Sequence, residues 1–394
     1  MTTPVSRLQR FARRSELIAP FEVMEVLAQA HRMQAAGADV IHLEVGEPDF
    51  TTPEPIVQAA TAALGSQAMF YTPALGLPQL REAISEHYAT RYGVTIPMDR
   101  IVVTAGSSAA LLMALGLVLD VGDHALVGDP GYPCNRHFVT FVDAEPVLVP
   151  TDAETDYQVT ADLLAAAWTP HTRAVIAASP SNPTGTMIAR HEWQRIAALC
   201  RDRGATLVAD EIYQGLVYGR EPETVLSLTD DAIVVNSFSK YFQMTGWRLG
   251  WLVVPDGATR EIEKLAQNLF ICPSTLAQHA ALAAFAPETI AILESRRSEL
   301  ETRRNVLLEA LPQIGFGVRA RPDGAFYIYC DVGDLTDDSF AFARHILDQT
   351  AVAITPGRDF GVAAPDQHLR IAYTQPVPRL QEAVERIGAM IARG

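Results

Sequence analysis

Cysteine is scarce in this sequence, and both long apolar runs and an excess of positive charge are missing. The four cysteines among 394 residues form no CxxC pair, so the sequence indicates neither a metal site nor a disulfide framework, and it fits a reducing compartment. No segment approaches the roughly 18 consecutive apolar residues of a membrane-spanning helix, so we expect no membrane partner. The formal net charge of -15 argues against a nucleic-acid partner, because phosphate binding needs a basic surface.

The first residues of the chain are basic and contain Arg7, Arg10, Arg13 and Arg14. No apolar segment follows them, so they do not resemble a secretory signal. They run directly into residues 18–21 and a helical pattern, which predicts an amphipathic first helix of the folded protein. An organellar presequence is the alternative. We therefore expect a soluble, cytoplasmic protein.

Short apolar runs alternate with helical patterns over roughly residues 100–255. Continuous apolar strands of this kind are buried on both faces, which is typical of a mostly parallel sheet between layers of helices. The sequence therefore predicts an α/β fold with three layers. The expected strands cover residues 100–104, 124–128, 174–178, 206–209, 232–235 and 250–254, with crossover helices at 108–119 and 191–203.

The pattern changes towards the C-terminus. A long helical region over 258–311, interrupted near 272–273 and at 287, precedes short strands at 317–319, 325–329 and 369–372 and helices at 339–348 and 377–393. We interpret this region as a smaller α+β domain to which the N-terminal helix adds. The expected organisation is an N-terminal segment (1–50) that joins the small domain, a large domain (51–290) and a C-terminal small domain (291–394).

Lys240 follows the apolar run 232–235 and two hydroxyl side chains. A lysine at the rim of a buried sheet loses solvation, and nearby cations lower its pKa further, so its amine becomes a nucleophile that forms Schiff bases. The alternative is an ordinary surface lysine, since most lysines are exposed.

Other polar residues follow the expected strands, and ligands of open α/β sheets bind at the carboxyl ends of strands. Gly106, Ser107 and Ser108 open a helix whose free N–H groups suit an anion such as phosphate, although a serine N-cap has the same pattern. Arg248 could add a second cation there. Asp210 ends a buried strand, so it either pairs with an arginine or faces a protonated ligand nitrogen.

Two further residues suggest contacts with a small molecule. Asn182 lies in a turn bracketed by prolines, which would present its amide in a fixed direction, although the segment could be only a turn. Arg370 lies within an apolar strand pattern, and its planar guanidinium suits a carboxylate in bidentate geometry.

Taken together, these motifs closely resemble the class I/II aminotransferases of the pyridoxal-phosphate fold type I group. The resemblance rests on 182–185 (Asn-Pro-Thr-Gly), Asp210 with Tyr213, 237–240 (Ser-Phe-Ser-Lys) and 246–248 (Gly-Trp-Arg), in that order. It extends from about Glu16 to the C-terminus. It is greatest for the subgroup with a mobile N-terminal segment.

The resemblance implies a role for each matching residue. Lys240 would hold pyridoxal 5'-phosphate as a Schiff base and move the proton at the substrate α-carbon. Asp210 would keep the pyridine nitrogen protonated, and Tyr213 with Asn182 would bind the phenolate oxygen. The phosphate would be bound by Ser107, Ser108, Ser237 and Arg248, with Ser239 as a weaker candidate. Gly106, at the start of the same helix, would also contact the cofactor.

The remaining implied contacts concern the ring face, the partner subunit and the substrate. Tyr132 would stack on the pyridine ring, and Tyr71 would reach the phosphate of a neighbouring subunit, so the active unit would be a homodimer with shared active sites. Gly46, Asn182 and Arg370 would bind the substrate α-carboxylate. No residue set suggests a metal.

Two positions bear on the choice of substrate. Aspartate-selective relatives often carry a lysine where this chain has Ser108, so its absence favours neutral or aromatic amino donors. Arg358 stands where relatives usually have a small residue. It could bind a second carboxylate, but we favour a structural pair with Asp359 or another surface acid.

The leading prediction is a ping-pong aminotransferase that moves an amino group from an L-amino acid to a 2-oxo acid. A carbon-sulfur beta-lyase on the same scaffold is the alternative, because both reactions start from loss of the same α-proton. A non-catalytic regulator that binds pyridoxal phosphate is a third possibility. Net acidity and the short segment before residue 16 disfavour it, since such regulators carry an extra DNA-binding domain.

Overall fold

A seven-stranded sheet forms the centre of the larger part of the molecule. The computed structural model describes residues 11–66 and 68–393. The strand order is β2-β8-β7-β6-β5-β3-β4, and all neighbours are parallel except that β8 runs antiparallel to both β2 and β7. The strands are β2 (Ile101–Thr104), β3 (His124–Asp129), β4 (Glu145–Pro150), β5 (Thr172–Ala178), β6 (Thr206–Asp210), β7 (Ile233–Ser237) and β8 (Gly250–Val253).

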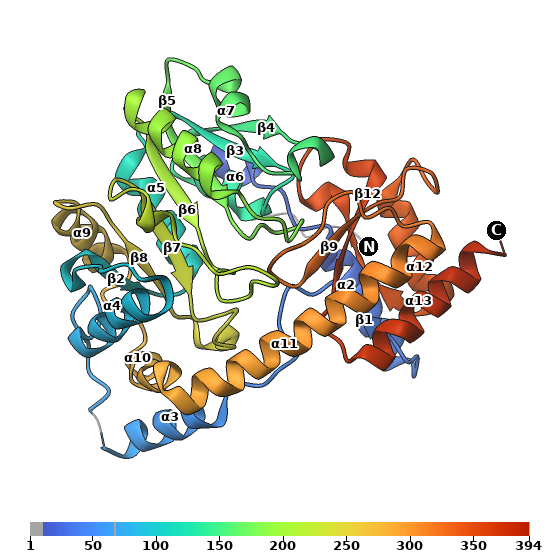
Figure 1. Cartoon of the computed structure of the whole chain (residues 1–394), viewed down its shortest axis with the longest axis horizontal. Coiled ribbons are helices and arrows are strands. Elements are labelled where there is room, and N and C mark those ends of the chain that lie inside the picture. Colours follow the sequence, from blue (N-terminus) through green and yellow to red (C-terminus); the bar gives the residue numbers. More distant parts are fainter. Residues whose placement is uncertain (1–10, 67, 394) are drawn as a thin grey trace.

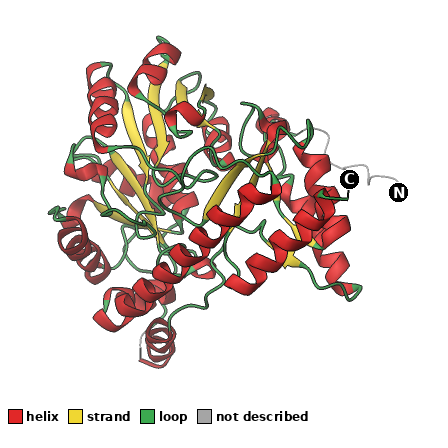
Figure 2. Cartoon of the chain, turned by 45° about the vertical axis from the view of Figure 1, so that its right-hand side comes forward, coloured by secondary structure: helices red, strands yellow, loops and turns green. Residues whose placement is uncertain are grey.

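Helices flank this sheet, as Figure 2 shows by colour. The apolar helix α5 packs against β7 and β8, and α8 packs against β6. Since every residue of β2, β7 and β8 is buried, the continuous apolar runs in the sequence correspond to strands covered on both faces. The predicted α/β fold is confirmed. The flanking helices are α4 (Pro78–Tyr92), α5 (Ser107–Val118), α6 (Pro133–Phe141), α7 (Ala161–Ala167), α8 (Arg190–Asp202) and α9 (Thr259–Leu269), and α3 (Glu54–Ser66) and α10 (Thr275–Ala281) pack against each other and other helices.

A second, smaller sheet lies at the other end of the long helix α11 (Pro287–Ala310), which crosses the molecule in Figure 1. Its antiparallel order is β11-β12-β9, and helices α12 (Ser339–Thr350) and α13 (Val377–Ile391) accompany it. The strands are β9 (Tyr327–Asp331), β11 (Thr355–Pro356) and β12 (His368–Ala372).

The N-terminal segment packs against this smaller part. Strand β1 (Ile41–His42) pairs in parallel with β10 (Val352–Ala353), and α2 (Val23–Ala35) contacts α12, β10 and β11. The expected union of the two chain ends is therefore present. The domain boundaries at residues 50 and 290 stay a prediction.

Two details differ from the sequence-based expectations. Residues 317–319 form only an isolated bridge between Gly317 and Asp331, and the Arg319 side chain donates to the Asp331 carboxylate at 2.9 Å. The first helix is also not continuous: α1 (Arg13–Leu17) buries no residue and ends before Pro20, and α2 begins after it. Arg7 and Arg10 lie outside the described residues.

Strand β4 was not expected from the sequence. Proline lies at its second and last positions, and only one of its six residues is fully buried. It occupies the edge of the sheet beside β3, where a proline without an N–H is tolerated.

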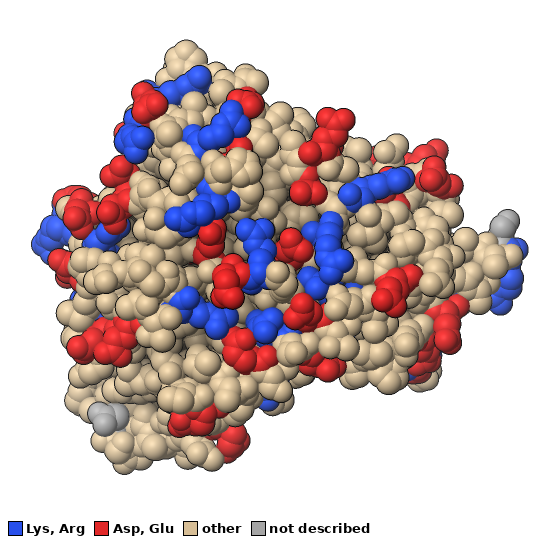
Figure 3. Space-filling model, in the orientation of Figure 1, with Lys and Arg blue, Asp and Glu red and all other residues tan. Residues whose placement is uncertain are grey.

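Charged groups of both signs mix on the surface. On the face shown in Figure 3, basic and acidic side chains lie beside one another. Within residues 11–66 and 68–393, no single helix is both long and apolar enough to cross a membrane, and one pair bent by 81° (275–285 with 287–314) meets only the length and composition criteria.

Candidate active site

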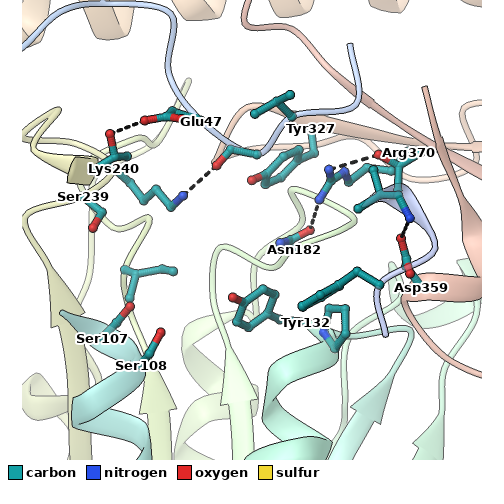
Figure 4. Close-up of a pocket in the computed structure, with 18 of the residues that line it drawn as sticks. Glu47, Ser107, Ser108, Tyr132, Asn182, Ser239, Lys240, Tyr327, Asp359 and Arg370 are labelled. Atoms are coloured by element: carbon teal, nitrogen blue, oxygen red, sulfur yellow. Dashed lines mark hydrogen bonds between the residues drawn. The ribbon is translucent and has the colours of Figure 1, made fainter. Parts of the chain in front are cut away.

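A cavity of about 520 Å³ lies where the carboxyl ends of the central strands face the smaller sheet. Its lining comes from five parts of the chain: the N-terminal segment, the start of α5, the start of α6, the ends of β5 and β6 with the loops after β5, β6 and β7, and the smaller sheet with the segment between β11 and β12. Residues far apart in sequence therefore meet in one place. Figure 4 shows the labelled side chains converging on this space.

Lys240 reaches this cavity from the loop after β7. Its Nζ donates to the backbone oxygen of Gly46 at 2.7 Å, and Figure 4 shows this bond. Burial lowers the pKa of Lys240 to about 8, Glu47 opposes the shift, and the charges of Arg370 and Arg248 add to it. The amine is thus not a solvent-exposed surface group, and a fraction of it is neutral near pH 7.

The start of α5 forms one wall of the cavity. Its N-cap, Gly106, has a φ of 83°, and a β-carbon there would lie 2.6 Å from the Arg248 guanidinium, so only glycine allows this approach. Ser107 and Ser108 line the cavity, and the N-cap glycine has no side chain to cap the helix. The first N–H groups of α5 and the Arg248 cation therefore face the same region, which suits an anion.

The two serines of the 237–240 motif differ in position. Ser239 lines the cavity. Ser237 does not belong to its lining, and its hydroxyl donates to the Leu249 oxygen at 3.3 Å and accepts from the Ser239 N–H at 3.0 Å. Ser239 therefore borders the cavity, whereas the Ser237 hydroxyl makes hydrogen bonds within its own loop and to the Leu249 backbone.

Asp210 is the last residue of β6 and is only 3% exposed. One carboxylate oxygen accepts from the Ile212 N–H at 3.2 Å, and no Lys, Arg or His forms an ion pair with it within residues 11–66 and 68–393. Burial raises its pKa to about 6. Of the two alternatives left open by the sequence, a structural pair with arginine is absent, and the carboxylate faces the cavity.

Aromatic hydroxyls surround the far side of the cavity. The Tyr213 hydroxyl lies 2.9 Å from the Tyr327 hydroxyl, and burial raises the pKa of Tyr213. Tyr132 also lines the cavity, and burial raises its pKa as well. All three phenols are therefore neutral hydrogen-bonding groups at physiological pH.

Arg370 projects from β12 and is 5% exposed. Its Nη1 donates to Asn182 Oδ1 at 3.0 Å, and its Nη2 donates to the Glu44 oxygen at 2.5 Å and to Thr355 Oγ1 at 3.1 Å. Within the described part of the chain, its Nε has no hydrogen-bond partner and no acid pairs with it. A buried guanidinium held by neutral oxygens lacks the anion that would balance its charge.

Two sequence-based candidates lie away from this cavity. Tyr71 is 80% exposed and Phe70 beside it is 78% exposed, and neither lines the cavity of this chain. Arg358 is also outside the lining. It pairs with Asp366 at 2.5 Å and with Asp338 at 3.2 Å, so the expected structural pairing is correct, but Asp359 is not its partner.

The sequence did not single out several residues of the site. Tyr327 was predicted only as part of a strand. Glu47, which accepts a hydrogen bond from Thr245, belongs to none of the sequence motifs. A third group covers the cavity with apolar side chains, all of which except Phe360 belong to the N-terminal helical pattern of the sequence. These side chains are Phe21, Val23, Met24, Leu27 and Phe360.

Comparison with known proteins gives a consistent result. The family model "Aminotransferase class I and II" matches residues 38–387. The chain is 42% identical to a valine–pyruvate aminotransferase of Mycobacterium tuberculosis over 95% of this chain and 97% of that protein. It is 33% identical to an aspartate aminotransferase of Geobacillus stearothermophilus, over 96% and 98% of the two chains.

Solved structures are similar as well. The crystal structure of an aminotransferase from Mycobacterium tuberculosis superimposes with a TM-score of 0.95 at 41% identity, and the match covers 98% of this chain and 100% of that one. The two curated relatives and this structure are all named as aminotransferases. These names favour amino transfer over the elimination reaction of a lyase.

Proposed function

Because the chain belongs to the class I and II aminotransferase family and is a pyridoxal-phosphate-dependent aminotransferase, we propose that the cavity around Lys240 moves the amino group of a neutral or aromatic L-amino acid to a 2-oxo acid. The observation that carries this proposal is Arg370. It is a buried guanidinium without an acidic partner in the described chain, and it lines the same cavity as Lys240. An amino acid supplies both the missing carboxylate and an amine.

The residues around the cavity fit the three polar parts of pyridoxal phosphate. Lys240 offers an amine of lowered pKa to the aldehyde. The uncapped start of α5, with Arg248, offers N–H groups and a cation to the phosphate, with Ser239 beside them. Asp210 is a buried carboxylate that forms no ion pair with the described residues, so it can accept a hydrogen bond from the pyridinium N–H.

When bound, pyridoxal phosphate supplies an electron sink for the bonds at the substrate α-carbon. The chain does the rest. Lys240 would accept the α-proton and return it, a step that its lowered pKa favours because a general base works best near the ambient pH. Arg370 would hold the substrate carboxylate, so that one bond of the α-carbon is oriented for cleavage.

The side-chain end of the cavity supports a neutral or aromatic donor. Its lining there is apolar, with Val23, Met24, Leu27 and Phe360 among the contributors. Ser108 stands where a lysine would add a cation, and Arg358 is held by Asp366 and Asp338. The side-chain carboxylate of a substrate such as aspartate would thus lose its solvation in this region, and neither position 108 nor Arg358 would offer it a free cation.

A panel of amino donors tests the proposal. Purified protein with added pyridoxal phosphate is incubated with alanine, valine, leucine, phenylalanine or aspartate and with either 2-oxoglutarate or pyruvate, and the new amino acid and the new 2-oxo acid are quantified. We expect equal amounts of both products, with the apolar donors faster than aspartate. Release of ammonia and pyruvate without formation of a new amino acid would instead indicate elimination.

We also infer that the active unit is a homodimer with shared sites. Tyr71 and Phe70 are large aromatic side chains that stand exposed in the single chain, an arrangement that favours burial against another copy. Mixing Lys240→Ala with Tyr71→Ala protein, each inactive or weak alone, should restore activity, because one hybrid site receives both native residues. Failure of the mixture, together with a monomer in sedimentation, would argue against shared sites.

A further inference from the structure

The carboxylate of Asp359 lies at the N-terminus of a helix more than 300 residues earlier in the chain. Asp359 Oδ1 accepts from the Glu22 N–H at 2.7 Å and Oδ2 accepts from the Val23 N–H at 2.8 Å. Asp359 is only 4% exposed, and Figure 4 shows one of these bonds beside Arg370. Both oxygens of one carboxylate are thus bound to the first N–H groups of α2.

Helix α2 has no capping side chain of its own. Its N-cap residue, Glu22, makes no side-chain hydrogen bond to the helix. The first N–H groups of a helix need an acceptor, and a negative charge there also interacts favourably with the helix dipole. Asp359 therefore provides, from the loop before β12, the cap that the local sequence lacks.

The capped end of α2 is the part that covers the cavity. Val23, Met24 and Leu27 line it from the first turns of the helix, and Phe21 lines it from the residue before the N-cap. On the other side of Asp359, the Phe360 ring lies 4.9 Å from the Arg370 guanidinium. One short segment thus contacts both the apolar cover and the group that would bind the substrate carboxylate.

Helix α2 buries two side chains in the structure as described. Its buried residues, Val26 and Ala30, pack in a small apolar cluster with Val40, Leu347 and Ala353, on the side of α12 and β10. Helix α1, which precedes α2, buries no residue. Residues 23–25 of α2 therefore bury no side chain, and the Asp359 carboxylate binds the backbone there.

We propose that Asp359 is a positioning residue that caps α2 from a distance and thereby holds the apolar side chains of its first turns over the side-chain end of the substrate site. This inference rests on the proposed function for its effect on substrates. Its structural part, the cap, does not depend on which donor the enzyme uses. Loss of the cap would weaken binding of donors whose side chains reach the cover, and would affect alanine less.

Hydrogen exchange tests the cap directly. Cofactor-loaded wild type and Asp359→Asn are compared without substrate, because asparagine keeps the volume but offers one acceptor oxygen and turns an N–H group toward the second helix N–H. We expect exchange over residues 22–27 to be about tenfold faster in the variant. Exchange in α8 should be unchanged, which shows that the fold is intact. Equal protection of residues 22–27 in both proteins overturns the proposal.

Asp366→Asn is the matched control. Asp366 lies in the same loop and pairs with Arg358, but it does not bond to α2 and does not line the cavity. This variant should leave exchange over residues 22–27 as in wild type. An equal acceleration in both variants would mean that any loosening of the loop releases the helix, and it would overturn the specific role of the Asp359 carboxylate.

Steady-state kinetics test the effect on substrate binding. For Asp359→Asn we expect the KM for leucine and phenylalanine to rise about tenfold, the KM for alanine to rise less than about threefold, and kcat for all three to change little. Faster exchange with equal KM changes for all donors would overturn the role in substrate binding. If wild type transfers no amino group from apolar donors, the proposed function fails, while the exchange experiment still decides whether the cap exists.

Discussion

Substitution of Arg370 by methionine should strongly weaken the binding of amino acids while it leaves the fold nearly as stable as before. The guanidinium is buried, it lacks an acidic partner in the described chain, and its donors bind Asn182, the Glu44 oxygen and Thr355. Methionine has a similar length and no charge. The substitution thus removes an uncompensated buried cation, and it creates no orphaned carboxylate.

The magnitude follows from the contacts that are lost. Truncating one partner of a buried, hydrogen-bonded charge pair costs about 2–5 kcal/mol, so amino-acid binding should weaken by about 30-fold to several thousandfold. Stability should change much less. Thr355 still donates to the Glu44 oxygen at 3.0 Å, and only Asn182 loses its partner, at a cost of about 1–2 kcal/mol, which relief of the buried charge offsets.

The assay compares an amino acid with an amine that lacks the carboxylate. For wild type and Arg370→Met, the dissociation constants of leucine and of 3-methylbutylamine are measured from the spectral change of the bound cofactor, and thermal unfolding is followed in parallel. Only leucine should bind more weakly in the variant. Equal weakening of both ligands, or a fall in Tm of more than about 10 °C, would show that Arg370 supports the structure and does not bind the carboxylate.

Three further perturbations follow from the geometry. Asp210→Asn should lose most turnover. Because burial raises the pKa of Asp210 from 3.8 to about 6, the charged carboxylate destabilises the native state, and this loss of stability is complete once the pH has risen above about 6. Urea titrations of cofactor-free protein should therefore find the variant about 3 kcal/mol more stable than wild type at pH 7.5 and no more stable at pH 3.5. Gly106→Ala should weaken pyridoxal phosphate about tenfold or more in fluorescence titrations, since the new β-carbon meets the Arg248 guanidinium at 2.6 Å in a backbone of positive φ, while Gly116→Ala in the same helix, with no atom within 4 Å, should not. Lys240→Ala should yield no borohydride-fixed adduct on the peptide that bears position 240, whereas a persisting adduct there would remove Lys240 from its role.

The sequence was sufficient for the central strands and for much of the site because both depend on local patterns. Six apolar runs predicted β2, β3, β5, β6, β7 and β8. Asp210 ends β6, and Asn182 and Lys240 lie in the loops after β5 and β7. A residue that ends a parallel strand reaches the ligand edge wherever the strand lies in the sheet. The motif residues could thus be placed together without knowledge of the strand order.

The parts that the sequence could not predict depend on contacts between distant segments. The direction of β8 relative to its neighbours is set by tertiary pairing, and Arg358 pairs with Asp338 and Asp366 instead of the adjacent Asp359. Adjacent side chains in a short turn point in different directions. The choice of partner therefore depends on how the loop folds over α12 and β12, which no local pattern encodes.

The electrostatic arrangement of the cavity explains why its residues differ from an ordinary core. Lys240 has a lowered pKa, Asp210 has a raised one, and Arg370 has no counter-ion in the described chain, so the protein alone leaves three buried groups imperfectly balanced. Each imbalance matches a group of opposite character on the cofactor or the substrate. Ligand binding should therefore stabilise the fold, because relief of these desolvation penalties contributes to the binding free energy. The surrounding β-sheet core, which is apolar and fully buried, supplies the stability that offsets them.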